Sequence, residues 1–230
     1  MRASLKLAGV DVVIARSWFV TQPFVAGACA WAAYALEPQL GAGAALVLGT
    51  AVAAALSASL LIHELAHAFV SMRAGIGIDQ VRLFAAGALC RRRAPIEQPR
   101  DQFMVAAAGP LASVALGVLT LAGAVVVEIL ALSGALSIAL GFLAFANILI
   151  AASNMLPVFP FDGGKVVHAM FWRSLRDRRA ASRRLRRSGQ EFARVIIGLG
   201  VVMIAWAGDL VLGLAISAFG VYLMFMPPPP

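Results

Sequence analysis

The stretch Leu60-Leu61-Ile62-His63-Glu64-Leu65-Ala66-His67-Ala68-Phe69 decides how the rest of the chain is interpreted. It places three ionisable side chains in a segment that is otherwise apolar. Residues four apart lie on one face of a helix, with Cβ atoms about 5–6 Å apart, so His63 and His67 can offer two imidazole nitrogens to one metal ion. Glu64 follows directly and can act on a water molecule at that metal without being a ligand.

The same pattern also arises by chance on soluble helices, where histidine and glutamate are ordinary solvated residues. The flanking residues argue against that interpretation, because from Ala44 to Met72 the only other polar side chains are small hydroxyls. Ionisable side chains at membrane depth are costly and mark functional sites. Counted from Arg73 at 1.5 Å per residue, the histidines lie about 9–15 Å below the membrane surface. A metal held there is still reachable by water.

The composition predicts an all-α polytopic membrane protein with about six transmembrane helices. Of the 230 residues, 61% are hydrophobic and the mean hydropathy is +0.88, whereas soluble domains are about half apolar. Cys29 and Cys90 suggest no disulfide framework, and no cleavable signal peptide is expected. We expect one membrane-embedded domain over residues 1–230. A spanning helix needs about 20 apolar residues, and the candidate spans are residues 18–36, 44–72, 103–130, 136–156, 192–207 and 210–226.

The net charge of +8 is distributed in a way that favours a membrane over nucleic acid. All lysines and arginines fall within residues 2–16, 73–100 and 165–194, and the turns between the other span ends carry only acidic charges. The positive-inside rule then places both termini, and the histidine end of the second span, on the cytoplasmic side of the cell membrane. We expect the basic segment 173–190 to be a solvated loop against anionic lipid headgroups. It lacks interleaved aromatic residues, so no nucleic-acid partner is expected.

Two connecting segments show strand-like alternation. Residues 4–15 predict a short hairpin at the membrane surface. Residues 76–84 predict a strand, followed by a small apolar loop, as a short β insertion near the cytoplasmic face. Two interpretations of this insertion stay open: an ordinary cytoplasmic connector, or a strand beside the active site that presents an unpaired edge.

The fourth span continues into Pro157-Val158-Phe159-Pro160-Phe161-Asp162-Gly163-Gly164, which cannot remain a regular helix. Irregular backbone at this depth persists only where protein or a water-filled cavity covers it, so we expect Asp162 to face a cavity level with the histidines. A carboxylate there is the expected third zinc ligand, which leaves the fourth position for water. The alternative is an ordinary Pro-Asp-Gly loop at the membrane surface. His168, on the helical stretch that follows, is expected at the interface rather than on the metal.

Three motifs together resemble those of the site-2 proteases, zinc metalloproteases that cut substrates within or near the membrane. Residues His63 to His67 resemble the HExxH motif of that family, Ala108-Gly109-Pro110 resembles its AGP motif, and residues 154–163 resemble its NxxPxxPxDG motif. On the residues alone, the small side chains of 106–113 predict close helix packing. The resemblance covers nearly all the chain, and no PDZ or CBS module is expected in it.

The resemblance implies one zinc ion held by His63, His67 and Asp162, with Glu64 as the general base. Asn154 would hold the substrate or its developing oxyanion. The substrate would be a single-span membrane protein, such as an anti-sigma factor or a membrane-tethered transcription regulator, cut in regulated intramembrane proteolysis. The insertion would hold an unwound substrate segment by β-augmentation, through the residues Val81, Leu83, Phe84 and Gly87.

Two rival functions use the same residues differently. A transporter or zinc-holding membrane protein would use the metal ligands without hydrolysis, and it has no specific need for a proton acceptor at Glu64. A scaffold would recruit a partner through its arginine-rich segment, and deleting residues 176–187 would then remove function while variants of the two histidines retained it.

Overall fold

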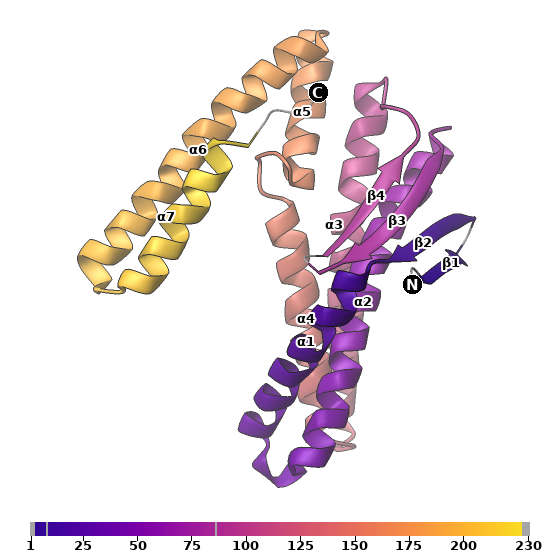
Figure 1. Ribbon diagram of the computed structural model, residues 1–230, viewed down its shortest axis with the longest axis vertical. Helices are drawn as coiled ribbons and strands as arrows, with labels where there is room; N and C mark the ends of the chain where they lie inside the picture. The colour runs from indigo at the N-terminus through magenta and orange to yellow at the C-terminus, as the bar shows by residue number, and fades with distance from the viewer. Residues whose placement is uncertain (1–2, 8, 86, 227–230) are drawn as a thin grey trace. The chain divides into compact units, whose positions relative to one another are not determined.

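The computed structural model describes residues 3–7, 9–85 and 87–226 of the chain. It is mostly helical, with one small sheet (Figure 1). The chain divides into two compact units, in place of the single domain that the sequence predicts. The first unit is residues 1–95 with 108–152, and the second is residues 96–107 with 153–230. In chain order the elements are β1 (Ala3–Leu7), β2 (Val10–Ile14), α1 (Arg16–Leu36), a 3-10 turn (Pro38–Leu40), α2 (Ala42–Arg73), β3 (Ile78–Phe84), β4 (Gly87–Arg92), α3 (Pro99–Ile129), α4 (Gly134–Asn154), α5 (Asp162–Leu175), α6 (Arg178–Ala207) and α7 (Leu210–Met224).

Among the described residues, five helices are long and apolar enough to cross a membrane: α1, α2, α3, α4 and α6. They correspond to five of the six expected spans, to within two residues at the C-terminal ends of the spans expected at 103–130 and 136–156. The sixth, residues 210–226, forms α7, which has 15 residues. Its length is about 22 Å at 1.5 Å per residue, shorter than the hydrocarbon core of about 30 Å. The polytopic class is therefore supported, and the count of six spans is not confirmed.

In the first unit, the spanning helices pack through small residues and a polar contact. α1 and α2 form an antiparallel pair (Figure 1) whose backbones meet at Gly49, where an added Cβ would lie 2.6 Å from the carbonyl oxygen of Ala26. Asn147 of α4 is fully buried and donates from Nδ2 to Ser59 Oγ of α2 at 3.2 Å. Such contacts hold helices together in lipid, where apolar surface alone gives little driving force.

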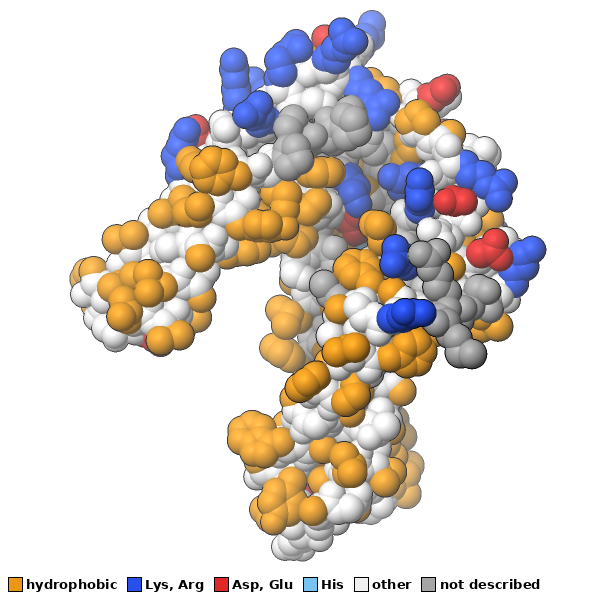
Figure 2. All heavy atoms as spheres, viewed as in Figure 1, with side chains coloured by type: hydrophobic (Ala, Val, Ile, Leu, Met, Phe, Trp, Pro, Cys, Tyr) orange, Lys and Arg blue, Asp and Glu red, His pale blue; other side chains and the backbone are white. Residues whose placement is uncertain are grey.

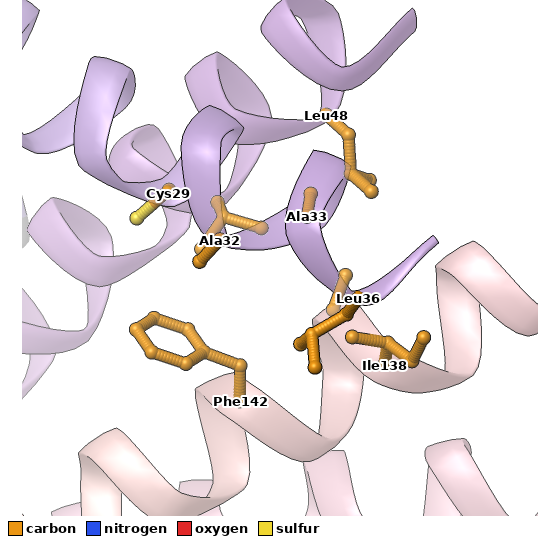
Figure 3. Close-up of a pocket in the computed structure, with 9 residues that line it drawn as sticks. Cys29, Ala32, Ala33, Leu36, Leu48, Ile138 and Phe142 are labelled. Carbon is orange, nitrogen blue, oxygen red and sulfur yellow. The ribbon is translucent and has the colours of Figure 1, made fainter. Parts of the chain in front are cut away.

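A small apolar pocket lies among α1, α2 and α4, where Phe142 faces Cys29 and Ala32 (Figure 3). Its cavity volume is about 40 Å³. The only polar side-chain group in its lining is the thiol of Cys29. A space of this size holds little more than a water molecule, so it is not a binding site for a peptide segment.

The four strands form a sheet in the order β1-β2-β3-β4. β1 and β2 are antiparallel and form the expected N-terminal hairpin, β2 and β3 are parallel, and β3 and β4 are antiparallel. The predicted strand insertion is therefore confirmed. The sheet packs against α2 through buried apolar side chains, which are Val10, Val12, Ala68, Ile78, Val81 and Leu83.

The expectation of an unpaired edge at Val81 to Phe84 is wrong. β3 pairs with β4 on one side, and on the other side Val81 is paired with Val12 of β2 and Leu83 with Ile14. The second partner comes from the N-terminal hairpin, so the local pattern of residues 75–93 could not indicate it. The outer strands of the sheet are β1 and β4, and the edge that the insertion offers belongs to β4.

In the second unit, the basic segment 173–190 is helical rather than a loop. α5 ends at Leu175, Arg176 adopts a left-handed conformation with φ 54°, and α6 begins one residue after Asp177. The Asp177 carboxylate caps α6 by accepting from the Arg179 N–H at 2.8 Å. The residues four apart that α6 buries are Ala181, Leu185, Gly189 and Ala193. A row of buried small and apolar residues on one side is typical of an amphipathic helix. In the sequence, the many arginines around these residues hide their helical spacing.

His168 is buried in the second unit, and its expected place at the membrane interface stays a prediction. It is 1% exposed, and both ring nitrogens have partners: Nδ1 lies 2.8 Å from Gln102 Nε2, and Nε2 lies 3.0 Å from Ser182 Oγ. Burial lowers the pKa of His168, and the charge of Arg178 lowers it further, against a hydrogen bond to the Arg178 backbone that raises it. The imidazole is a polar link between α3, α5 and α6.

Acidification should loosen this unit through His168. Its pKa lies below the ordinary value of about 6.5, so near and below that pH the unfolded chain binds more protons than the folded one, and stability falls as the pH falls. Amide hydrogen exchange in α5 and α6, corrected for the intrinsic effect of pH, should be faster at pH 5.5 than at pH 7.5. His168→Gln should reduce this difference. The same pH response in both proteins would contradict the assignment.

Candidate metal centre

The side chains of His63 and His67 converge at one point on α2. They are 3% and 5% exposed, and their Nε2 atoms lie 3.2 Å apart. Two nitrogen ligands at 2.0–2.1 Å from a tetrahedral zinc are separated by about 3.3 Å. The two imidazoles are thus spaced as ligands of one metal ion.

Ser113 of α3 orients the first of these rings. Its side chain is fully buried, and its Oγ lies 2.9 Å from His63 Nδ1. A hydroxyl that accepts the Nδ1 proton leaves the Nε2 lone pair directed at the metal position, as the outer partners of metal-binding histidines do. From the sequence, the 106–113 segment is expected only to pack helices together, and nothing in that expectation indicates this role of Ser113. The available signal was the spacing, because Ser113 lies four residues after Gly109 and therefore on the same face of α3.

Gly109 leaves room beside the two imidazoles. An added Cβ would lie 2.5 Å from His63 Nε2 and closer still to His67 Nε2. The backbone of α3 therefore passes directly over the donor atoms, and any side chain at this position would occupy the space next to them. The AGP motif packs α3 against α2 as expected, and its glycine also lines the metal position.

Glu64 lies between the histidines and the sheet. Its Oε2 accepts a hydrogen bond of 2.7 Å from the backbone N–H of Cys90 in β4. His63, Glu64 and His67 each offer one possible metal-ligand atom, and these three atoms lie within 4.8 Å of one another. In the described part of the chain, this is the cluster of histidine, cysteine and acidic side chains that could hold a metal ion. The carboxylate therefore lies next to the metal position.

The hydrogen bond from Cys90 also shows which way β4 faces. Cys90 is opposite Val81 in the antiparallel ladder, yet its N–H points to Glu64, so this is a pair without ladder hydrogen bonds. Because such pairs alternate along an antiparallel ladder, the N–H and C=O of Ala88 also point to the outer edge. Glu64 therefore lies along the outer edge of β4.

Asp162 and Asn154 belong to the second unit. Asp162 is the first residue of α5, is 3% exposed, and forms an ion pair with Lys165 in which Oδ1 and Nζ are 2.8 Å apart. Asn154 is the last residue of α4 and is half-buried. The histidines lie in the first unit, so the roles of Asp162 as third ligand and of Asn154 as a substrate contact stay predictions.

The irregular segment before Asp162 is partly covered by protein: Val158 is buried, whereas Met155, Pro157 and Pro160 are exposed. An added Cβ at Gly163 would lie 2.6 Å from the Leu156 carbonyl oxygen, and one at Gly164 would lie 2.5 Å from that of Val158. The segment therefore folds back onto the first turn of α5, and the two glycines permit this close approach.

Of the proposed strand contacts, Val81 and Leu83 are buried under the sheet, whereas Phe84 and Gly87 are half-buried and pair at the end of the hairpin.

The fold and the site define a helical membrane protein with an HExxH metal centre within the apolar part of a spanning helix. The chain belongs to Peptidase family M50, which it matches over residues 51–137 and 127–204. This confirms the resemblance to the site-2 proteases. The chain is 37% identical over 183 residues to Rip3 from Mycobacterium tuberculosis. It is 33% identical over 164 residues to sll0528 from Synechocystis, and both relatives are named as zinc metalloproteases.

These matches cover 77% and 71% of this chain but 45% and 42% of the two relatives. The chain thus spans less than half the length of either. Among solved structures it is similar to the site-2 protease from Methanocaldococcus jannaschii, with a TM-score of 0.54 over 100% of this chain and 98% of that one. The sequence identity is 16%, so this likeness concerns the fold.

Replacing Gly109 by alanine should remove metal binding, because the new methyl group would occupy the space beside both Nε2 atoms. We expect the affinity for Zn²⁺ to fall by more than about tenfold, measured by chelator competition and by metal content after purification. Gly123→Ala on the same helix is the control, since its Cβ would meet Leu140 at 3.5 Å. Unchanged affinity in Gly109→Ala, with wild-type circular dichroism, would refute this geometry.

Proposed function

We propose that this chain is an intramembrane zinc metalloprotease that hydrolyses a peptide bond in or near the transmembrane segment of a membrane-anchored protein. One observation carries the proposal: two buried imidazole nitrogens 3.2 Å apart, next to the bare backbone of Gly109, lie on a helix apolar enough to span a membrane. Family membership and the names of the relatives support zinc as the metal and proteolysis as the activity.

The residues of the site would divide the work as follows. His63 and His67 hold the metal, with Asp162 as the third ligand. Zinc in this position supplies Lewis-acid polarisation of the scissile carbonyl and lowers the pKa of water. Glu64 takes the proton from the attacking water and passes it to the leaving amine. Asn154 donates to the carbonyl oxygen as negative charge develops on it.

The outer edge of β4 is the proposed place for the substrate backbone. A transmembrane helix hides its carbonyl groups in internal hydrogen bonds, so it must unwind before attack. The main-chain groups of Ala88 face outward, and Glu64 is bonded to the next outward N–H, that of Cys90. A segment added to this edge as a strand would therefore lie beside the general base.

The charge distribution supports a location in the cell membrane with the basic ends of the helices in the cytoplasm. Lys and Arg side chains gather where α5 meets α6, while the remaining length of α6 and α7 shows mostly apolar side chains (Figure 2). The basic surface where α5 meets α6 would lie against anionic headgroups. The substrate would be a single-span protein, such as an anti-sigma factor or a membrane-tethered transcription regulator, consistent with regulated intramembrane proteolysis.

Replacing Glu64 by glutamine should separate hydrolysis from metal handling. The amide cannot accept the proton of water, so we expect cleavage to fall by about a hundredfold or more, while both histidines still bind zinc. Quantitative membrane proteomics of the native host should show one or a few single-span proteins accumulating uncut in the Glu64→Gln strain and co-purifying with the variant. Glu128→Gln, at the far end of α3, is the matched control.

The rival function predicts a different outcome. If Glu64→Gln and wild-type membranes have the same proteins while zinc binding and zinc flux are unchanged, the chain handles metal without hydrolysis. Accumulation of substrates in the Glu128→Gln strain as well would mean that the effect does not come from the metal centre.

A proline at position 88 should test the substrate edge. Ala88→Pro removes an outward N–H without removing a ladder hydrogen bond to β3, since residue 88 lies in a pair without such bonds. We expect cleavage to fall by about tenfold with zinc content unchanged. Ala88→Val, which keeps the N–H, should retain cleavage. Equal loss of cleavage and zinc in Ala88→Pro would instead indicate general damage to the site.

A further inference from the structure

A groove lies between the first turns of α3 and the last turns of α5, within the second unit. Its cavity volume is about 580 Å³. The spacing of its lining residues places one face of each helix toward the other. From α3 these residues are Pro99, Arg100 and Phe103, and from α5 they are Ala169, Met170, Arg173 and Ser174.

The groove is charged at one end and apolar at the other. On α3, Arg100 precedes Phe103 by one turn, and the helix continues from there into its apolar span. On α5, Met170 precedes Arg173 by one turn, and the helix continues toward the basic start of α6. In both helices the arginine therefore lies on the polar side and the apolar residue on the side of the spanning segments.

Neither guanidinium group has a carboxylate counter-ion among the residues that the structure describes: none lies within ion-pair distance of Arg100 or Arg173. A guanidinium presents several donors in a planar fork that matches the oxygens of a phosphate. Ser174 adds a hydroxyl at the same end of the groove. The polar end is thus complementary to a phosphate.

The apolar end is exposed in a way that suits a hydrocarbon chain. Phe103 is 44% exposed and Met170 is 58% exposed. A free phosphate ion would make no use of these two side chains, and an uncharged lipid would leave two arginines without a partner. One molecule that satisfies both ends has an anionic phosphate and an acyl chain.

We propose that this groove binds an anionic phospholipid of the surrounding membrane, with the phosphate between Arg100 and Arg173 and the acyl chain over Phe103 and Met170. The proposal rests on the membrane location proposed above but not on proteolysis. It differs from the general attraction of the basic surface, because it requires two particular arginines. A bound lipid would also bridge α3 and α5, the helices that carry Gln102 and His168.

The test compares lipid retention in matched variants. Wild type, Arg100→Gln with Arg173→Gln, and Arg179→Gln with Arg186→Gln are purified in mild detergent with phosphatidylglycerol or phosphatidylcholine, and bound lipid is counted by native mass spectrometry. Both double variants lose two charges, but Arg179 and Arg186 lie on α6 outside the groove. Ser174→Glu, at an exposed position, places a carboxylate beside the two arginines and gives a second way to weaken the site. Zinc content reports on folding.

We expect wild type and the α6 variant to retain phosphatidylglycerol in preference to phosphatidylcholine. The groove variant and Ser174→Glu should bind phosphatidylglycerol at least about fivefold more weakly. Equal retention by the groove variant and wild type would overturn the proposal. Equal loss in both double variants would replace the site with diffuse attraction. Displacement of the lipid by millimolar inorganic phosphate would replace it with a small-anion site. None of these readouts depends on peptide cleavage, so they stand apart from a failure of the proposed enzyme activity.

Discussion

The close approach of α3 to the histidines of α2 is the constraint on which the first unit depends. Two imidazoles within an apolar helix are costly unless each polar atom has a partner. Ser113 provides a partner for His63 Nδ1, and Gly109 keeps the space beside both Nε2 atoms open. Any larger residue at position 109 would enter that space. The close packing of α2 against α3 and an open metal position therefore both require glycine there.

α2 buries most of its polar side chains and exposes several large apolar ones, opposite to a helix in water. Its hydroxyls at Ser57, Ser59 and Ser71 are buried together with the histidines, whereas Ile62 and Phe69 are 42% and 49% exposed. In a bilayer the outer surface contacts lipid, and buried polar groups can satisfy one another. The site therefore lies on the protein-facing side of a helix that presents apolar side chains elsewhere.

Much of this arrangement could be predicted from local sequence, because the deciding signals are short in range. The spacing of His63 and His67 fixes a shared helix face, and the long apolar runs fix the helices. The pairing of β3 with β2 could not be predicted in the same way, since the two strands lie far apart in the chain and their alternation does not specify partners. The helical form of the basic segment was obscured because α6 buries only small residues and Leu185 among its arginines. Ser113 was missed because a serine in a run of small residues has no distinctive pattern of its own.

If the outer edge of β4 holds the substrate as proposed, its outward main-chain groups have a consequence for selectivity. Hydrogen bonds to a backbone are the same for every residue type except proline, so an edge of this kind distinguishes extended from helical chains rather than one sequence from another. A substrate that joins β4 would therefore be chosen by the free energy needed to unravel its helix. Glycine, proline or polar residues within a membrane span lower that free energy, and their position along the span would determine where the chain is cut.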